Sequence, residues 1–138
     1  MLEVDVVRIS VIVPIYNVKL YIERCVRSLM EQTLENIEFI FVNDCTPDDS
    51  MDILHYVLEE YPKRREQIKI IEHETNRGIS AVRNTGLKNA TGQYIIYCDS
   101  DDWVEKNMYE KLLVKALETS ADIVGCDFFD DYVAHSTI

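Results

Sequence analysis

The chain has 138 residues, of which 47% are hydrophobic and 28% charged, the composition of an ordinary folded domain and not of a disordered or fibrous segment. Its 25 acidic and 14 basic residues give a formal net charge of −11, which repels phosphate backbones and argues against nucleic acid as a partner. We expect a single domain over residues 1–138.

Cysteine spacing and the apolar runs bear on the compartment of the protein. The four cysteines are far apart with no CxxC pair, which argues against a zinc knuckle or a secreted disulfide framework: Cys25, Cys45, Cys98 and Cys126. Residues 1–5 carry acid where a signal peptide carries base, and no apolar run approaches the roughly 18 residues of a membrane span. We therefore expect a cytoplasmic protein with no transmembrane segment in this chain.

Strands and helices alternate in the first half of the chain. The β-branched run Ile9–Val13 is typical of a strand buried on both faces, and Pro14 is expected to stop it. A helix with an apolar stripe follows at Ile22, Cys25, Val26, Leu29 and Met30. Strands at Ile37–Val42 and Ile68–Ile71 flank a second helix with its stripe at Met51, Leu54, Val57, Leu58 and Tyr61.

The second half continues the alternation. Asn76-Arg77-Gly78 opens a third helix, Thr91-Gly92 follows its end, and Tyr94–Cys98 is predicted to be the fourth strand. The stripe of the third helix is Ile79, Val82, Gly86 and Ala90. The last predicted elements are a helix with apolar positions Met108, Leu112, Leu113, Ala116 and Leu117, and a short strand at Asp122–Cys126.

This alternation predicts a Rossmann-like, three-layer α/β/α fold with a mostly parallel sheet, because right-handed crossovers place helices on both faces. Ligands of such sheets bind at the carboxyl ends of the strands. The segments just past the predicted strand ends are polar or acidic, and we expect them to meet at one edge: Pro14–Asn17, Asn43–Asp44, Asn76–Gly78 and Asp99–Asp102.

Three carboxylates follow the fourth strand, on Asp99, Asp101 and Asp102. Like charges this close repel one another unless a cation neutralises them. Mg²⁺ or Mn²⁺ prefers oxygen ligands and leaves positions open for substrate phosphates, so the cluster predicts a metal that binds a diphosphate. The alternative is that Asp101 and Asp102 only cap the following helix.

Other polar residues near this edge have structural alternatives too. Asp44 could be a turn residue ahead of Pro47, and Arg83 a solvated residue on a helix. Tyr16 could pack at the surface or stack on a flat base. The histidines share no spacing with one another or with cysteine and are interpreted as scattered surface residues: His55, His73 and His135.

Ordered motifs cover most of the chain: Ser10–Asn17, Gln32-Thr33, Phe41–Asp44, Asn76–Asn84, Gly86, Ala90–Ile95 and Asp99–Asp102. In this order they resemble family 2 glycosyltransferases over residues 9 to 126. The resemblance implies the GT-A fold and transfer of a sugar, with inversion, from a nucleotide diphosphate donor to an acceptor hydroxyl.

The resemblance also implies roles on the nucleoside side of the site. Pro14 and Tyr16 would line the nucleoside pocket, with Asn17 of the same motif in the donor site. Asp44 would accept a hydrogen bond from the base, which suits the imide N–H of uracil and a UDP-sugar donor. Arg83 would organise Asp44 or the donor.

On the phosphate side, the resemblance implies that Asp101 ligates Mg²⁺ or Mn²⁺, helped by Asp102. Asp99 would contact the ribose or the metal and its water. The metal would stabilise the leaving diphosphate.

Two departures from the family pattern affect the expected site. Asn43 stands where the family often has Asp, and Cys45-Thr46-Pro47 replaces a frequent Gly-Ser-Thr, so the loop beside the base is expected to differ. The general base of the family lies on a later acidic residue, so no catalytic residue is assigned. We expect the sequence to be truncated at its C-terminus and to form the nucleotide-sugar-binding half of a catalytic domain.

The implied partners are a nucleotide diphosphate sugar and a saccharide or lipid-linked acceptor. Peripheral attachment to the inner face of the membrane and a homodimer are both left open. Three alternatives compete with this reading. A sugar nucleotidyltransferase lacks support because its Gly-rich, basic triphosphate loop is missing after the first strand. A non-catalytic nucleotide-sugar-binding fragment stays open, and a phosphoacceptor signalling domain would need an acidic pair where Pro14–Asn17 stands.

Overall fold

The computed structural model describes residues 6–130. In this range the strands are β1 (Ile9–Ile15), β2 (Ile37–Asn43), β3 (Ile68–Glu72) and β4 (Tyr94–Tyr97). The helices are α1 (Ile22–Met30), α2 (Ser50–Leu58), α3 (Ile79–Lys88) and α4 (Met108–Thr119), and a 3-10 helix, η1 (Pro62–Gln67), precedes β3. No helix among these residues is long and apolar enough to cross a membrane.

All four strands lie parallel in one sheet, in the order β3-β2-β1-β4. The central strands β1 and β2 pair Val11 with Phe39 and Val13 with Phe41. Nearly every residue of both strands is buried. Burial on both faces explains why these strands are continuous apolar runs and do not alternate with polar residues.

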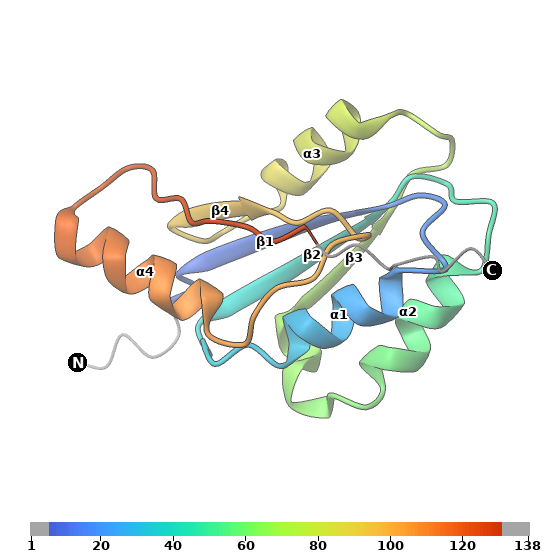
Figure 1. The fold of residues 1–138 in the computed structure, drawn as a ribbon. Coiled ribbons are helices and arrows are strands. Elements are labelled where there is room, and N and C mark those ends of the chain that lie inside the picture. Colours follow the sequence, from blue (N-terminus) through green and yellow to red (C-terminus); the bar gives the residue numbers. More distant parts are fainter. Residues whose placement is uncertain (1–5, 131–138) are drawn as a thin grey trace.

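Helices cover both faces of the sheet (Figure 1). On one face, Val82 of α3 packs against Ile12 and Ile40. On the other, α1, α2 and α4 bury a larger core that includes Leu29 and Leu54. All five apolar positions predicted for α1 are buried. The predicted three-layer α/β/α fold with a parallel sheet is confirmed.

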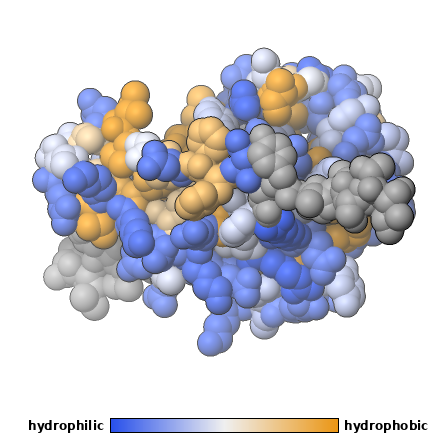
Figure 2. Space-filling view, in the orientation of Figure 1, coloured by the Kyte–Doolittle hydropathy of each residue, from blue (hydrophilic) through white to orange (hydrophobic). Residues whose placement is uncertain are grey.

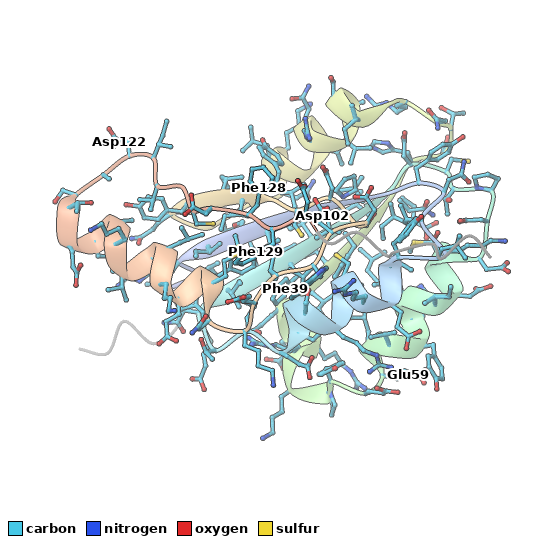
Figure 3. All side chains as sticks on the ribbon, viewed as in Figure 1. Phe39, Glu59, Asp102, Asp122, Phe128 and Phe129 are labelled. Carbon is cyan, nitrogen blue, oxygen red and sulfur yellow. The ribbon has the colours of Figure 1, made fainter. Side chains whose placement is uncertain are left out.

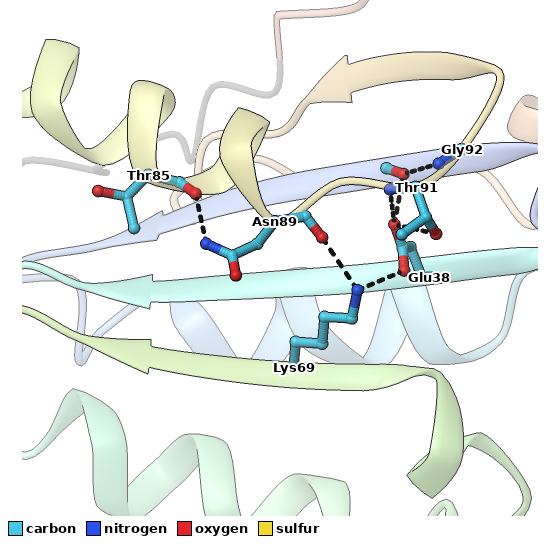
Figure 4. Close-up of polar contacts among 7 residues, drawn as sticks. Glu38, Lys69, Thr85, Asn89, Thr91 and Gly92 are labelled. Atoms are coloured by element: carbon cyan, nitrogen blue, oxygen red, sulfur yellow. Dashed lines mark hydrogen bonds and ion pairs between the residues drawn. The ribbon is translucent and has the colours of Figure 1, made fainter.

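A buried polar network holds the end of the sheet at which β1 and β2 begin (Figure 4). One Glu38 carboxylate oxygen accepts hydrogen bonds from the Ser10 hydroxyl and the Thr91 N–H, both at 2.6 Å, and Lys69 Nζ lies 3.1 Å from the other. The Ser10 hydroxyl oxygen accepts from the Gly92 N–H at 2.8 Å. Burial raises the pKa of Glu38, but these hydrogen bonds outweigh it and lower the pKa below 4.5. The Thr91-Gly92 motif is therefore structural.

β1 continues through Pro14 to Ile15, so the prediction that Pro14 stops the strand was wrong. The Ile12 carbonyl accepts a hydrogen bond from the Cys98 N–H. The backbone groups of residues two apart in a strand point toward the same neighbouring strand. The Pro14 nitrogen therefore points to the side of β4, as the backbone of Ile12 does, but at a level just past the end of β4. No ladder bond is lost there, and the Pro14 carbonyl accepts the Ser100 hydroxyl at 2.6 Å.

The strand predicted at Asp122–Cys126 is also wrong, because residues 121–130 have no regular structure. Side chains here are exposed: 90% for Ile123, 82% for Phe128 and 84% for Phe129. Figure 3 labels Phe128 and Phe129 in the middle of the face that it shows, where Figure 2 shows hydrophobic surface. A strand propensity is realised only against a partner, and within residues 6–130 no strand pairs with this segment.

α4 packs largely through the predicted stripe: Leu113 and Ala116 are buried, and Met108 and Leu112 are partly buried against the core. Tyr109 is only 1% exposed, whereas Leu117 is 53% exposed. The buried positions Tyr109, Leu113 and Ala116 repeat at helical spacing, so the amphipathic helix was predicted correctly, with Tyr109 missed and Leu117 wrongly included.

Candidate functional site

A pocket of about 410 Å³ lies at the carboxyl edge of the sheet. It is lined by the ends of three strands and by the start of α3: Pro14, Ile15, Tyr16, Val18, Asp44, Asn76, Gly78, Ile79, Val82, Asp99, Ser100 and Asp101. This is the position predicted from the parallel topology. Segments far apart in the sequence meet here because β1, β2 and β4 end at the same edge.

One end of the pocket carries the acidic cluster, which consists of Asp99, Asp101 and Asp102. One carboxylate oxygen from each residue lies within 4.8 Å of the other two, and all three residues are exposed. Partial burial and then the charges of Asp101 and Asp99 raise the pKa of Asp102. The cluster therefore carries an unbalanced negative charge that a divalent cation with oxygen ligands would neutralise, so the residues fit a Mg²⁺ or Mn²⁺ ion.

Helix capping does not account for these carboxylates. α4 begins only at Met108, and its N-cap residue is Asn107. Asp101 and Asp102 instead lie in the turn after β4, where the Asp102 N–H donates to the Asp99 carbonyl at 3.0 Å. The helix-cap alternative is thus wrong.

Arg83 of α3 approaches the cluster from the side. Its guanidinium lies 3.7 Å from Asp99 Oδ1 and 5.4 Å from the centre of the Tyr97 ring. Both partners are about half exposed, so this pairing is weak by itself. Arg83 places one positive charge beside Asp99, and its ion pair is with that residue and not with Asp44.

The other end of the pocket is formed around Asp44, which is only 3% exposed. Its Oδ1 accepts the Arg77 N–H and its Oδ2 accepts the Gly78 N–H, both at 2.8 Å. His73 Nδ1 lies 2.8 Å from Oδ1. Burial raises the pKa of Asp44, but the hydrogen bonds from His73, Arg77 and Gly78 outweigh it and lower the pKa. Asp44 is an ionised hydrogen-bond acceptor that also shapes the loop before α3.

His73 was predicted to be a surface residue, and this was wrong. It follows the last residue of β3, is 8% exposed, and lies between Asp44 and Thr85 Oγ1, which is 2.8 Å from His73 Nε2. His55 is exposed as predicted, and His135 lies outside the described residues. The signal that could have identified His73 is its position directly after a strand, on the edge that binds ligands.

The loops after β1 and β2 are bonded to each other beside the pocket. The Asn17 N–H donates to Thr46 Oγ1 at 2.9 Å, and the Val18 N–H donates to Ser50 Oγ at 3.2 Å. Asp48 accepts from Ser50 and Thr46. Burial raises the pKa of Asp48, but these bonds outweigh it and lower the pKa to about 2. The segment with the unusual Cys45-Thr46-Pro47 sequence therefore supports the loop after β1.

The structure brings most of the sequence-predicted site residues together. Pro14, Tyr16, Asp44, Asp99 and Asp101 all line the pocket. Asn17 and Arg83 are not among the lining residues: Asn17 has a left-handed backbone (φ 52°) beside Thr46, and Arg83 lies behind Asp99. Of the other lining residues, Ile15, Asn76, Gly78 and Ser100 lie in segments predicted to meet at this edge, whereas Val18, Ile79 and Val82 were not predicted to lie in the site.

A larger, more open hollow of about 850 Å³ lies between α1 and residues 103–107. Arg24 lies over the Trp103 ring there, 4.4 Å from its centre. None of the three clustered carboxylates lines this hollow. Size alone does not make it the site, because the strand ends and the carboxylates of Asp44, Asp99 and Asp101 line the smaller pocket.

A parallel α/β sheet with a polar pocket at its carboxyl edge is characteristic of nucleotide-binding proteins. Comparison with known proteins specifies the family. The family model described as glycosyl transferase family 2 matches residues 10–134, and the chain belongs to this family.

Known relatives agree with this assignment. The chain is 48% identical, over 121 residues, to the uncharacterized glycosyltransferase EpsJ of Bacillus subtilis, covering 88% of this chain and 34% of EpsJ. Crystal structures of S. aureus TarS 1-349 in complex with UDP and with UDP-GlcNAc each match with a TM-score of 0.73 and 32% identity over 83% of this chain. The match covers 33% and 32% of the respective TarS 1-349 chains. The fold is therefore GT-A, and the chain spans about a third of the length of these relatives.

A mannosyltransferase from Pyrobaculum calidifontis, PcManGT, in complex with GDP-Man and Mn²⁺, is also similar. Its TM-score is 0.65 and its identity 28%, over 70% of this chain and 28% of PcManGT. Structural neighbours of this chain thus bind nucleotide sugars, and one of them binds Mn²⁺.

Proposed function

We propose that residues 1–138 form the nucleotide-sugar-binding half of a glycosyltransferase that transfers a sugar from a UDP-sugar, with inversion, to an acceptor hydroxyl. The observation that carries this proposal is that one pocket joins an acidic cluster to a buried hydrogen-bond acceptor, Asp44. These two features suit the two ends of a nucleoside diphosphate. The names of the TarS complexes, with UDP and UDP-GlcNAc, support the choice of nucleotide.

The base would bind at the Asp44 end. Asp44 Oδ2 accepts a single protein hydrogen bond among the described residues, so a lone pair is available to the imide N–H of uracil. Tyr16 is 44% exposed at the pocket wall, where its ring offers a surface for stacking on the base. Pro14 gives the wall an apolar surface without a competing N–H.

The phosphates would bind at the acidic cluster. Asp101 and Asp99 would hold Mg²⁺ or Mn²⁺, with Asp102 close enough to assist. A bound divalent ion supplies charge stabilisation to a departing diphosphate. Arg83 lies 3.7 Å from Asp99, so its charge would act beside a ligand of the metal and not on the base.

A saccharide or lipid-linked acceptor would be deprotonated by a general base, and we assign that role to none of the described residues. The four cysteines of the described range are all free, which supports a reducing, cytoplasmic location, at the inner face of the membrane if the acceptor is lipid-linked.

Calorimetric titration of the folded chain with UDP, in Mn²⁺ and in EDTA, tests the proposal. We expect UDP to bind in Mn²⁺ and its affinity to fall at least about tenfold in EDTA, because the diphosphate then meets an uncompensated acidic cluster. GDP provides the comparison for the base. A folded chain that binds neither nucleotide in Mn²⁺ would contradict the proposed donor site.

A further inference from the structure

Three side chains form a continuous buried line from α3 to the pocket. Thr85 Oγ1 lies 2.8 Å from His73 Nε2, and His73 Nδ1 lies 2.8 Å from Asp44 Oδ1. The side chains of His73 and Asp44 are only 5% and 4% exposed. A buried imidazole that joins a pocket carboxylate to a helix hydroxyl holds both groups in place, because it bonds through both of its ring nitrogens.

The hydrogen-bond partners of His73 determine which ring nitrogen carries a proton. Asp44 is ionised, since its pKa is lowered despite burial, and a carboxylate can only accept. Nδ1 of His73 must therefore carry a proton and donate it to Asp44. Nε2 lies 2.8 Å from the Thr85 hydroxyl, which can donate to or accept from a ring nitrogen, so both nitrogens of the ring are bonded.

This arrangement fixes which edge of Asp44 faces a ligand. Oδ1 accepts two donors, His73 Nδ1–H and the Arg77 N–H, and so is fully used. Oδ2 accepts only the Gly78 N–H among the described residues, and Asp44 lines the pocket. The surface that Asp44 presents to a base is therefore a hydrogen-bond acceptor with no donor character.

We infer that His73 is the positioning residue that sets the base preference of this site, by holding Asp44 so that it accepts a ring N–H and rejects a ring nitrogen with a lone pair. Uracil carries an N–H at ring position 3, whereas cytosine, of the same size, carries a lone pair there. His73 and Thr85 thus select uridine over cytidine nucleotides. This inference rests on the proposed function, because it assumes that a pyrimidine nucleotide occupies the pocket.

Titration with UDP and with CDP, both in Mn²⁺, tests the inference through the ratio of the two dissociation constants. We expect the wild-type chain to bind UDP at least about tenfold more tightly than CDP. His73→Leu removes the donor to Asp44 and should bring the ratio close to one, because the variant then binds UDP more weakly. His55→Leu makes the same substitution at an exposed histidine of α2 and should keep the wild-type ratio.

A general loss of folded protein would not change the ratio, because it would reduce the binding of both nucleotides alike. His73→Asn keeps an N–H near the Nδ1 position and should restore part of the preference, while Thr85→Val removes the support on the other side and should lower it. A wild-type ratio in folded His73→Leu would overturn the inference and leave the proposed function standing. Absence of UDP binding to the wild-type chain would instead contradict the proposed function.

Nitrogen-15 NMR of the wild-type chain gives a second readout that needs no variant. We expect the His73 Nδ1 resonance to be that of a protonated ring nitrogen. It should also show a coupling across the hydrogen bond to Asp44, and the His55 resonance should show no such coupling. An Nδ1 resonance of the unprotonated type would overturn the inference even if His73→Leu failed to fold.

Discussion

A methyl group at Gly86 would lie 2.4 Å from Cγ2 of Ile12, because α3 packs directly on β1 at this point. The side chain of Ile12 is buried and has no open space to move into. We predict that Gly86→Ala lowers the free energy of unfolding by about 1–3 kcal/mol, since overpacking outweighs the gain of about 1 kcal/mol in helix propensity. Urea denaturation measures the difference.

Gly125 is the matched control, because a methyl group there would meet nothing within 4 Å. Gly125→Ala should change the stability by no more than about 0.5 kcal/mol. If Gly86→Ala were as stable as Gly125→Ala, α3 would not pack on β1 as described.

Arg64 of η1 holds the end of α1. Its guanidinium donates to the carbonyls of Met30, Gln32 and Leu34 and lies 5.8 Å from the centre of the Phe39 ring. Lysine cannot reach three carbonyls in this fork geometry. We predict that Arg64→Lys costs about 1–3 kcal/mol of stability, by leaving carbonyls unsatisfied.

Arg65 is the neighbouring control, because it is exposed. Arg65→Lys should be neutral within about 0.5 kcal/mol. Chemical denaturation of the two variants measures the difference. If Arg64 contributed only its positive charge, both substitutions would have the same small effect.

Glu38 should make the stability depend on pH. Its pKa is lower in the folded protein than its ordinary value of 4.5, so the unfolded chain takes up the proton first as the pH falls. The stability that Glu38 contributes is fully present above pH 4.5 and is lost as the pH falls through the lower, folded pKa. Glu38→Gln should cost about 1–3 kcal/mol at pH 7 and proportionately less in acid.

Unfolding curves at pH 7 and at several acidic values measure this effect. Glu66, which is exposed on η1, serves as the control, and Glu66→Gln should follow the wild-type curve. A Glu38→Gln difference that stayed constant with pH would show that the carboxylate charge is not what stabilises the network.

Sequence periodicity and the strand-end rule were enough to predict the core and the position of the site. The β-branched residues of Ile9–Val13 and the stripe from Ile22 to Met30 have only one arrangement that buries them. Asp99 and Asp101 were placed correctly because a residue that ends a parallel strand must lie at the carboxyl edge. These are local patterns whose consequences follow from the topology.

Features that depend on the path of a loop could not be predicted in this way. The hydrogen bonds from Arg77 and Gly78 to Asp44 require the loop before α3 to fold back over β2. The spacing of residues in the sequence does not indicate the path of that loop. His73 was misread because its partners, Asp44 and Thr85, are 29 and 12 residues away in the sequence. Asp122–Cys126 has strand-like composition, but strand formation depends on a neighbour.

Asp102 should destabilise the metal-free protein. Its pKa is raised in the folded state, first by partial burial and then by Asp101 and Asp99, so folding disfavours its charge and stability is lost as the pH rises through its titration. We predict that Asp102→Asn raises the stability in EDTA by about 0.5 kcal/mol or less, because solvent screens an exposed group. Thermal unfolding in EDTA and in Mn²⁺ should show that Mn²⁺ stabilises the wild-type chain more than the variant.

We expect Asp101 and its neighbours to hold a divalent metal that binds the diphosphate of a nucleotide in the pocket. Electron paramagnetic resonance of Mn²⁺, titrated into the wild-type chain and into Asp101→Asn with and without UDP, tests this most directly. We predict that UDP and Mn²⁺ raise each other's affinity by the same factor in the wild-type chain. We also expect Asp101→Asn to lose at least about tenfold in Mn²⁺ affinity with UDP present. Asp122→Asn, at an exposed aspartate outside the cluster, should behave as wild type. Wild-type binding of Mn²⁺ by Asp101→Asn in the presence of UDP would contradict the account.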